Sequence, residues 1–382
     1  MGSAQQRIEW TESHMPMLAG ISRRFEGAQP FSGLTIGVSL HIEPKTVVLL
    51  RTLQSGGAAV VATGNLGTTQ DDMVAVLLED GIETLGARDD DGATHLGHVR
   101  VVAERGPDLL LDNGADLAAA TITFGADVLG GTEETTSGAF RLRDELASTV
   151  GFPIIVINDS PLKAIVENKH AVGQSVMESF LRITNLMVQG KRFTVVGYGW
   201  CGRGIALYAR SLGGDVTVIE VDEIKALEAA VDGFGVADLA AAAPMTDVLI
   251  TATGAQGVVP VEAIEQLRDG AILANAGHFD NEIDVTGLRA LAENVEPLGD
   301  AIVRYRLPAG NKVALLAEGR MVNLAGTDPK GNSIESMDLG FALQALSLER
   351  LATDRTGLSP GPQAVPDDIN RTAAAEMVRL MM

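Results

Sequence analysis

Residues 192–204 read RFTVVGYGWCGRG, a short apolar run that ends in a glycine-rich turn. Gly197, Gly199 and Gly202 fit the pattern G-x-G-x-x-G, and the helix-like segment IALYARSL follows at 205–212. In such a turn the first glycine allows a tight bend and the second lets the backbone approach a pyrophosphate. The third lets the helix pack on the strand, while the helix N-terminus faces the phosphates. The stretch therefore predicts a Rossmann domain with a bound dinucleotide, beginning halfway along the chain.

The strand after this turn supports the same prediction. DVTVIEVD contains Glu220, 18 residues after Gly202. A carboxylate there accepts hydrogen bonds from both ribose hydroxyls and repels a 2′-phosphate, which favours NAD over NADP. A glycine-rich turn without a ligand is the alternative, and the order of strand, turn, helix and acid argues against it. Trp200 and Cys201 lie inside the loop, where a packed thiol is favoured over a functional one.

Composition sets outer bounds on the function. A chain of 382 residues with 46% hydrophobic residues predicts two domains with sizeable cores. The formal net charge of -21 disfavours nucleic acid and membrane partners. The one cysteine excludes an internal disulfide, and the first residues lack an apolar signal core, so we expect a cytoplasmic protein. His95 and His98 have the spacing of metal ligands, but no accompanying pattern supports a metal, and we expect a surface loop there.

Short apolar runs alternate with helical patterns along the chain. Such alternation predicts an α/β fold of two doubly wound, Rossmann-like domains with parallel sheets, over about 34–157 and 192–331. Segment 170–190 predicts a long joining helix that ends at Gly190. The apolar helix after residue 331 is expected to return to the first domain. LSPGPQAVPDD predicts a loop before a final amphipathic helix. The predicted strands are LTIGVSL, AAVVATG, PDLLLDN, FPIIVIN, RFTVVGYG, DVTVIEV, TDVLITATG and GAILANAG.

Both halves resemble the S-adenosylhomocysteine hydrolase family, in particular its shorter bacterial and archaeal branch. The resemblance covers about residues 14–350 and is carried by SLHIEPKT, TGNLGTTQDD, GGTEETTSG, VINDSPLK, VENK, VVGYGWCGRG, ANAGHFDNEID, LLAEGRMVNLAG and MDLGFALQALSLE. It implies an enzyme that keeps its NAD. The ribose 3′-hydroxyl is oxidised, the ketone acidifies the 4′ hydrogen, the 5′ thiol leaves and water adds. The stored hydride then reduces the ketone again, in a site closed by a hinge.

The resemblance also implies how the chain is divided. The expected parts are a nucleoside domain (1–168), a hinge helix (169–191), an NAD-binding Rossmann domain (192–331), a helix returning to the first domain (332–360) and a shortened C-terminal tail (361–382). A small-molecule nucleoside is the implied substrate. A homo-oligomer, either a dimer or a tetramer, is the implied assembly.

The motifs carry family roles onto particular residues. Lys163 matches the lysine that takes the 3′-hydroxyl proton, a role that needs a lowered pKa, which burial can supply. Glu134 matches the carboxylate that binds the 2′-hydroxyl. His41 matches the histidine that helps move the proton at the leaving-group end. Glu43 and Lys45 fall around the adenine, where Glu43 accepts from the 6-amino group and Lys45 positions it. A solvated charge pair is the alternative for these two.

Further matches surround the nicotinamide and the sugar. Asn158 matches a second asparagine of the substrate site, and His278 is counted with the catalytic residues as well as with the cofactor. The residues matched to the cofactor are Thr135, Thr136, Ser137, Asn168, His278 and Asn323, together with Thr253 and Gly277 at strand ends.

The chain departs from the family at five places. Asn113 replaces the aspartate that pairs with the matching histidine, and Asn332 replaces the histidine of a G-H-P loop. Glu167 replaces an aspartate beside the sugar hydroxyls, and Pro161-Leu162 alters the approach to Lys163. The C-terminal extension, which reaches a neighbouring subunit's NAD in longer members, is shortened. Because an amide cannot accept a proton at neutral pH, Asn113 removes a general base worth typically about 10²–10⁴-fold in rate.

Three functions are therefore open. The first is S-adenosylhomocysteine hydrolysis with tolerated substitutions, which the extent of the resemblance favours slightly. The second is a paralogue that makes the 3′-ketone but uses it for nucleoside epimerisation or redox chemistry without homocysteine release. The third is an inactive NAD-bound partner of a true hydrolase, against which Lys163, Glu134 and Glu220 argue.

Overall fold

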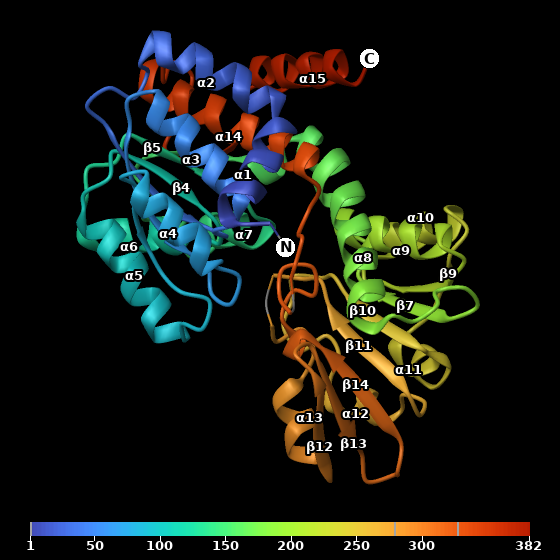
Figure 1. Ribbon diagram of the computed structural model, residues 1–382. Helices are drawn as coiled ribbons and strands as arrows, with labels where there is room; N and C mark the ends of the chain where they lie inside the picture. Colours follow the sequence, from blue (N-terminus) through green and yellow to red (C-terminus); the bar gives the residue numbers. More distant parts are fainter. Residues whose placement is uncertain (1, 279, 327) are drawn as a thin grey trace. The chain divides into compact units, whose positions relative to one another are not determined.

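The computed structural model describes residues 2–278, 280–326 and 328–382. It divides into two compact units, of which unit 1 is Met1–Ala164 with Ile334–Met382 and unit 2 is Ile165–Ser333. Figure 1 shows a twisted sheet with helices around it in each unit. The α/β prediction is confirmed, as is the return of the helix after residue 331 to unit 1.

The sheet of unit 1 has the order β15-β6-β5-β4-β1-β2-β3, and its described strand pairs are all parallel. Without β15, this is the doubly wound order 3-2-1-4-5-6. The order reverses between β1 and β4, where ligands bind in such sheets. The strands are β1 (Thr35–Leu40), β2 (Ala59–Gly64), β3 (Glu83–Leu85), β4 (Leu109–Asp112), β5 (Gly130–Glu133), β6 (Pro153–Val156) and β15 (Gly361–Ala364).

Helices cover both faces of this sheet. Adjacent strand residues point to opposite faces. A side chain at Gly130 would meet Leu351 of α14, whereas one at Gly131 would meet Leu110, which packs in the core formed with α5 and α6. The returning helix α14 therefore lies on the face opposite to α5 and α6. The helices are α1 (Ala4–Ser13), α2 (Pro16–Ala28), α3 (Pro44–Ser55), α4 (Asp71–Glu79), α5 (Gly92–Glu104), α6 (Asp116–Phe124), α7 (Thr136–Arg143), α14 (Ile334–Thr353) and α15 (Asp367–Met381), with the short turn η1 (Ile157–Asp159).

Unit 2 repeats the plan. Its sheet has the order β12-β13-β14-β11-β10-β7-β8-β9, with β12 and β13 antiparallel at one edge. Strands β9-β8-β7-β10-β11-β14 again follow the order 3-2-1-4-5-6, which reverses between β7 and β10. The strands are β7 (Arg192–Val196), β8 (Asp215–Ile219), β9 (Gly235–Val236), β10 (Val248–Thr251), β11 (Ala271–Asn275), β12 (Asn294–Gly299), β13 (Ile302–Arg306) and β14 (Lys312–Leu316).

Two apolar cores flank the sheet of unit 2. Val195 packs with Phe180 and Ile205 on the side of α8 and α9, while the next residue, Val196, packs with Ile264 and Leu288 on the side of α12 and α13. The helices are α8 (Val172–Thr184), α9 (Trp200–Ser211), α10 (Glu223–Val231), α11 (Leu239–Ala242), α12 (Val261–Glu265) and α13 (Val285–Leu291), with the turns η3 (Ala243–Met245) and η4 (Ala317–Gly319). A π-helix, η2 (Lys163–Ala171), precedes α8.

Three local predictions are wrong. The helix over 170–190 ends at Thr184 rather than Gly190, because Asn185 adopts the left-handed conformation that stops a helix. Part of the segment LSPGPQAVPDD is not a loop, because Gly361–Ala364 forms β15 and pairs in parallel with β6. His95 and His98 lie on helix α5 rather than on a surface loop, and His95 is buried.

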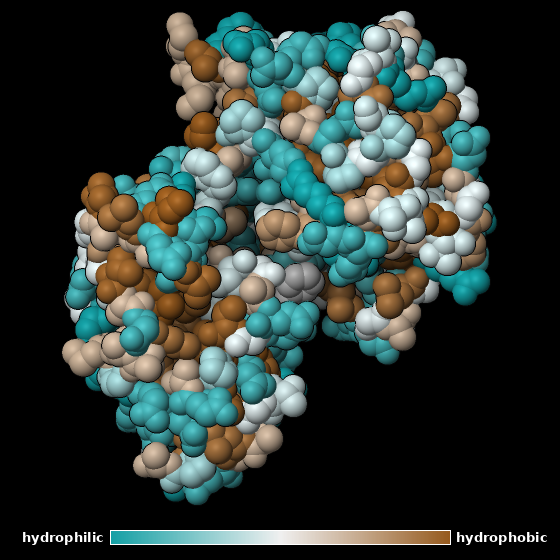
Figure 2. Space-filling model, turned by 180° about the vertical axis from the view of Figure 1, so that it is seen from behind, coloured by the Kyte–Doolittle hydropathy of each residue, from teal (hydrophilic) through white to brown (hydrophobic). Residues whose placement is uncertain are grey.

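The surface carries both hydrophilic and apolar residues. Figure 2 shows teal hydrophilic residues over much of one face, interrupted by brown apolar patches. In the described ranges, no helix is long and apolar enough to cross a membrane. Within the same ranges, no group of three or more histidine, cysteine or acidic side chains could hold a metal ion.

Candidate functional site

The candidate substrate residues of unit 1 gather at the carboxyl ends of the parallel strands. His41 directly follows β1, Asn113 follows β4 and Glu134 follows β5. The order of the sheet reverses between β1 and β4, and ligands of doubly wound sheets bind at such a point. The fold therefore places these three residues where a small molecule is expected.

Lys163 and Glu134 form a buried ion pair at this edge. The Lys163 Nζ lies 3.2 Å from the Glu134 Oε1, and the two residues are only 3% and 7% exposed. Lys163 begins the π-helix η2, a rare conformation that is frequent at functional sites. The same helix carries Glu167, which is buried, and Asn168, which is half-buried.

Glu43 and Lys45 form a second buried pair, at the start of α3. Their charged groups lie 2.8 Å apart, and both residues are buried. Burial raises the pKa of the Glu43 carboxyl, and the neighbouring Lys45 ammonium offsets part of that increase. The alternative of a solvated charge pair is therefore wrong. The pair offers one acceptor and one set of donors in a desolvated place.

The hydroxyl of Thr68 determines which nitrogen of His41 carries a proton. Thr68 Oγ1 lies 2.7 Å from His41 Nδ1 and donates its one hydrogen to the Asn65 carbonyl oxygen, 3.1 Å away. The hydroxyl can therefore only accept from the histidine, so Nδ1 carries the hydrogen in the neutral ring. In that tautomer the lone pair is on Nε2, and a ring with such a lone pair can act as a general base. Thr68 was not among the predicted site residues, although it lies inside the motif TGNLGTTQDD.

Asn113 takes part in an amide contact of its own. Asn65 Nδ2 donates to Asn113 Oδ1 at 2.9 Å, and both side chains are buried. The carbonyl oxygen of Asn113 is thus used as an acceptor within the protein. The residue that replaces the family's aspartate is held in place, and it supplies no proton acceptor.

Two buried carboxylates behind the site were also missed. Glu133 accepts hydrogen bonds from the backbone N–H groups of Gly114 and Ala115, each at 3.0 Å, and from Thr135 N at 2.8 Å. One side chain therefore ties the loop after β4 to the loop after β5. The sequence signal was the pair of adjacent acids in TEETTSG, of which only Glu134 was assigned.

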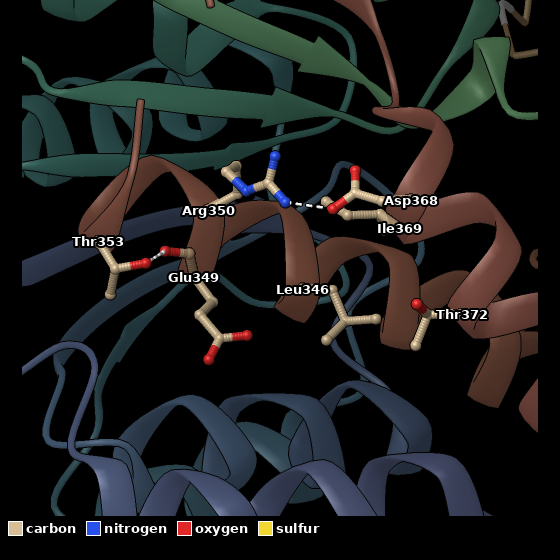
Figure 3. Close-up of a pocket in the computed structure, with 7 residues that line it drawn as sticks. All are labelled: Leu346, Glu349, Arg350, Thr353, Asp368, Ile369 and Thr372. Atoms are coloured by element: carbon tan, nitrogen blue, oxygen red, sulfur yellow. Dashed lines mark hydrogen bonds and ion pairs between the residues drawn. The ribbon is translucent and has the colours of Figure 1, made fainter. Parts of the chain in front are cut away.

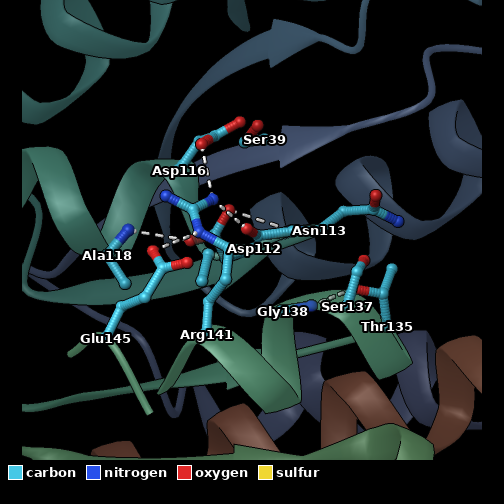
Figure 4. Close-up of polar contacts among 12 residues, drawn as sticks. Ser39, Asp112, Asn113, Asp116, Ala118, Thr135, Ser137, Gly138, Arg141 and Glu145 are labelled. Carbon is cyan, nitrogen blue, oxygen red and sulfur yellow. Dashed lines mark hydrogen bonds and ion pairs between the residues drawn. The ribbon is translucent and has the colours of Figure 1, made fainter. Parts of the chain in front are cut away.

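The second missed carboxylate is Asp112, which holds the first residues after β4. It accepts from Asn113 N at 2.9 Å and from Ala118 N at 2.7 Å (Figure 4). Burial raises the pKa of Asp112 to about 6. Burial and the nearby Asp112 charge raise the pKa of Glu133 to about 8. The two groups therefore bind protons more tightly than ordinary carboxyls.

Arg141 supports the same loop from α7. Its guanidinium donates to Asp116 at 2.7 Å and to the Gly114 carbonyl oxygen (Figure 4). Burial raises the pKa of Asp116, but hydrogen bonds from His95 and Arg141 outweigh it and hold that pKa below its usual value. His95 also contacts the Gly64 carbonyl oxygen at 3.2 Å. This histidine therefore belongs to the support of the strand ends.

In unit 2 the glycine-rich turn forms a cradle for a dinucleotide. Gly197 has φ of 100°, which favours glycine, and a Cβ at Gly202 would collide with the Gly197 carbonyl oxygen. A Cβ at Gly199 would meet nothing within 4 Å, so the space beside the backbone is open. The N-cap residue of α9 is Gly199, which has no side chain with which to cap the helix. Open space next to uncapped N–H groups suits a diphosphate.

The flanks of this cradle carry the other predicted residues. Arg203 stacks over the ring of Trp200, which is partly exposed, and the side chain of Cys201 is half-buried. The Glu220 carboxylate accepts from Tyr198 N at 2.7 Å and from Val221 N at 2.8 Å. Oε1 also accepts from Asp222 N at 3.0 Å, whereas Oε2 accepts only from Tyr198 N among the described contacts, so Oε2 keeps a lone pair for a ribose hydroxyl.

Glu282 holds the loop after β10. It accepts from Thr253 N at 3.0 Å, from Thr253 Oγ1 at 2.8 Å and from Gly254 N at 2.7 Å. Its carboxylate also fills the space that a side chain at Gly277 would need. Burial raises the pKa of Glu282. Sequence reasoning missed this residue, although it stands in the matched stretch ANAGHFDNEID.

Asn332 is linked through Ser175 to Asn323, a predicted cofactor contact. Ser175 Oγ donates to Asn332 Oδ1 at 3.1 Å and accepts from Asn323 Nδ2 at 3.0 Å. The structure thus brings Asn332, predicted as a substrate contact, next to Asn323, predicted as a cofactor contact. Ser175 joins them and was not predicted.

The remaining predicted residues differ in their exposure to solvent. Thr136 is exposed and Ser137 is buried at the start of α7, while Asn158 and His278 are half-buried. A separate hollow of about 260 Å³ lies between α14 and α15 (Figure 3). Arg350 and Asp368, which line it, already pair with each other. None of the predicted site residues lines this hollow.

Comparisons with known proteins agree with this geometry. The model of the family "S-adenosyl-L-homocysteine hydrolase" matches residues 2–128, and that of "S-adenosyl-L-homocysteine hydrolase, NAD binding domain" matches residues 168–328. S-inosyl-L-homocysteine hydrolase of Methanopyrus kandleri is 45% identical over 96% of this chain and 88% of its own length. Adenosylhomocysteinase of Thermococcus kodakarensis is 42% identical over 97% of this chain and 89% of its own length.

One solved structure extends the likeness of fold. A dipicolinate synthase chain from Bacillus halodurans has a TM-score of 0.50 and 13% identity, and the match covers 85% of this protein and 100% of that chain. At this identity the likeness concerns the fold alone. The match to the NAD-binding model, together with the open cradle at Gly199, identifies NAD as the cofactor.

Proposed function

We propose that this chain, which belongs to the S-adenosyl-L-homocysteine hydrolase family, hydrolyses S-adenosyl-L-homocysteine to adenosine and homocysteine through transient oxidation of the ribose 3′-hydroxyl. The observation that carries the proposal is the buried ion pair of Lys163 and Glu134 at the strand ends of unit 1. Burial favours the neutral amine, which can accept a proton from a sugar hydroxyl, and the neighbouring carboxylate stabilises the ammonium that then forms.

Each member of the pair has its own role in this proposal. Lys163 Nζ takes the proton of the 3′-hydroxyl. Glu134 accepts a hydrogen bond from the 2′-hydroxyl and keeps the lysine in place. NAD, when bound, accepts the hydride from the 3′ carbon and returns it at the end of the cycle.

His41 is the proposed group for proton transfer at the 5′ end. Its Nε2 carries the lone pair because Thr68 fixes the hydrogen on Nδ1. This nitrogen can give a proton to the departing sulfur and later take a proton from the incoming water. His41 thereby replaces the missing aspartate at Asn113, which has no proton acceptor to offer.

The buried pair Glu43 and Lys45 is the proposed contact for the purine. The carboxylate is an acceptor for a 6-amino group, and the ammonium is a donor for a 6-oxo group. One relative is named for the inosyl substrate and another for the adenosyl substrate. S-inosyl-L-homocysteine is therefore a second candidate substrate for the same reaction.

Epimerisation of a nucleoside is the second candidate function, and Asn113 is the observation in its favour. An amide takes up no proton at neutral pH, and its oxygen accepts a hydrogen bond from Asn65, so the position supplies no base for eliminating the thiol. A 3′-ketone that forms without elimination exchanges the hydrogen next to it. Asn113→Asp together with Asn332→His would then restore some homocysteine release.

Product analysis of the NAD-loaded protein tests these functions. The protein is incubated with S-adenosyl-L-homocysteine, with S-inosyl-L-homocysteine and with adenosine in deuterated water. Mass spectrometry follows free homocysteine, and sugar NMR follows exchange and inversion. Hydrolysis predicts homocysteine from at least one thioether. Exchange or inversion without homocysteine supports the epimerase, and no chemistry with any of the three supports an inactive partner protein.

We also propose that the chain works as a homo-oligomer, a dimer or a tetramer, in the cytoplasm. The family resemblance supports this, as do large apolar side chains exposed along α10 at Ile224, Leu227 and Val231. Light scattering of the purified protein gives the mass of the assembly. A monomer at micromolar concentration would contradict the proposal.

A further inference from the structure

We propose that Asn370, on the C-terminal helix α15, is a positioning residue for Lys163. The inference rests on the proposed function of Lys163. It starts from a contact between two residues that are 210 positions apart, since Ser160 Oγ donates to Asn370 Oδ1 at 2.7 Å.

Ser160 is the residue at which the chain turns from β6 into the helix of Lys163. It is 1% exposed. Its N–H donates to the Ile157 carbonyl oxygen at 3.0 Å, and its own carbonyl accepts from Ala164 N at 3.1 Å. Its hydroxyl oxygen accepts from Leu162 N at 3.2 Å. The conformation of Ser160 therefore sets where the first turn of this helix, and with it Lys163, begins.

Asn370 fixes the hydroxyl of Ser160 in one direction. To accept from Leu162 N, the Ser160 hydroxyl must turn a lone pair toward that N–H and its own hydrogen away from it. Asn370 Oδ1 accepts this hydrogen. The amide cannot flip, because Asn370 Nδ2 donates to the Val365 carbonyl oxygen at 3.1 Å. The asparagine thus uses an acceptor and a donor at once.

The segment that carries Asn370 is itself firmly attached to unit 1. Strand β15 pairs in parallel with β6, the strand that leads to Ser160, and Gly361 N donates to the Phe152 carbonyl oxygen at 2.9 Å. Ile369 is buried, and Arg350 of α14 pairs with Asp368 (Figure 3). Asn370 is therefore part of a fixed frame, within one unit, on which the lysine helix starts.

The effect on Lys163 follows from its tight surroundings. Its Nζ lies 3.2 Å from Glu134 in a buried place, three residues after Ser160. Displacement of a reacting group by about 1 Å costs about 10²-fold in rate. Loss of the acceptor at Asn370 allows the serine hydroxyl to rotate, and the first turn loses the capping contact at Leu162 N.

The test compares point variants of the full-length protein loaded with NAD. Asn370→Ala removes both contacts. Asn370→Asp keeps an acceptor for the Ser160 hydroxyl and loses only the donor to Val365. Arg371→Ala is the matched control on the same helix, since this side chain is 81% exposed and pairs only with Asp367 among the described contacts. Lys163→Ala is the reference for loss of the base.

Adenosine is added, and the absorbance of reduced nicotinamide follows the oxidation step. We expect Asn370→Ala to lower the maximal rate about tenfold to a hundredfold. The adenosine concentration at half-saturation stays close to that of the parent, because the purine contacts are untouched. Asn370→Asp recovers most of the rate, Arg371→Ala behaves as the parent, and Lys163→Ala is inactive. Melting temperatures are measured for all variants.

Three results would overturn the inference. The first is a parental rate for Asn370→Ala while Lys163→Ala is inactive, which leaves the proposed function standing. The second is an equal loss in Asn370→Ala and Arg371→Ala, or a loss in Asn370→Ala that Asn370→Asp does not recover. In that case the contact is structural only, and a drop in melting temperature without loss of rate leads to the same conclusion. The third is a parental rate for Lys163→Ala, which removes the base on which the inference rests.

Discussion

At the strand ends of unit 1, the position of one hydroxyl hydrogen affects which proton transfers His41 can carry out. The hydrogen of the Thr68 hydroxyl goes to the Asn65 carbonyl oxygen, and the ring of His41 is oriented as a result. The amide at Asn113 itself offers no proton acceptor. The chemistry proposed for the 5′ end therefore depends on the contact between Thr68 and His41.

Thr68→Val tests this arrangement, because valine has nearly the same shape and no hydroxyl. We expect homocysteine release to fall about tenfold or more, since general acid–base catalysis contributes about 10²–10⁴-fold. Reduction of bound NAD by adenosine stays at the parental rate. Thr69→Val is the control, since Thr69 donates to the same carbonyl oxygen at 3.0 Å. Equal release by Thr68→Val and the parent would show that His41 needs no such orientation.

A second prediction concerns the buried carboxyls Asp112 and Glu133. Burial and the nearby Asp116 charge raise the pKa of Asp112 to about 6, and burial and the Asp112 charge raise the pKa of Glu133 to about 8. The folded chain therefore binds these protons more tightly than the unfolded chain, in which both groups ionise near pH 4. The free energy of unfolding is then highest in acid with respect to these groups, and it falls as the pH rises through about 6 and about 8.

Urea unfolding between about pH 5 and about pH 9 measures that slope. Glu133→Gln removes the group that titrates at the higher pH, so we expect the decline above about pH 7 to become shallower. Glu145→Gln is the control, since the Glu145 side chain is 67% exposed. An unchanged slope in Glu133→Gln would mean that Glu133 is ionised throughout this range.

At the scale of elements, the returning helix α14 fixes the start of α2. Met15, the N-cap residue of α2, does not cap the helix with its side chain. Instead, the Asp338 carboxylate accepts from Met17 N at 2.8 Å and from Leu18 N at 2.9 Å. Asp338, Met17 and Leu18 are all buried. The contact joins segments more than 300 positions apart in sequence and closes unit 1 around its C-terminal part.

Asp338→Ala leaves two buried N–H groups without an acceptor. Each unsatisfied buried group costs about 1–3 kcal/mol, so the free energy of unfolding should fall by about 2–6 kcal/mol. Chemical denaturation at pH 7 measures the change, with the exposed neighbour Glu335→Ala as control. A loss below about 0.5 kcal/mol would show that water replaces the carboxylate.

The sequence predicted the elements with strong local signals and missed those that depend on distant partners. All eight predicted strands are present, because apolar runs between turn residues identify buried parallel strands. Strand β15 was missed, because GPQA has little strand propensity and becomes a strand only by pairing with β6.

The same distinction holds at the candidate site. The glycines and Glu220 follow from spacing along the chain. Ser175 and Asn370 act through contacts 157 and 210 positions away, which no local pattern encodes. Glu133 and Glu282 are visible as acids in the sequence, but their role depends on burial, which the pattern does not reveal.

At the scale of the whole molecule, both units use one plan. Each has a doubly wound sheet whose order reverses once, and each has a buried carboxylate that holds loops beyond the strand ends, Glu133 in unit 1 and Glu282 in unit 2. In each unit the predicted ligand residues follow these strands. Under the proposed function, unit 1 is the place for the nucleoside and unit 2 is the place for NAD.

Glu220→Ala tests the NAD half of this account. Without the carboxylate, the ribose hydroxyls lose an acceptor and a 2′-phosphate is no longer repelled. We expect NAD affinity to fall about tenfold and the preference for NAD over NADP to shrink by at least as much. Calorimetric titration of the cofactor-free protein measures both, with the exposed Glu223→Ala as control. Unchanged selectivity would mean that Glu220 does not face the ribose.

The most direct test of the central claim is the rate of thiol release from S-adenosyl-L-homocysteine by the unmodified, NAD-loaded protein. The account predicts steady, catalytic release of homocysteine, with adenosine formed in equal amount and NAD recovered in its oxidised form. Lys163→Ala, measured beside it, releases none. Reduction of bound NAD without release of homocysteine from the thioether would contradict the account, because the chain would then form the 3′-ketone without completing a hydrolysis.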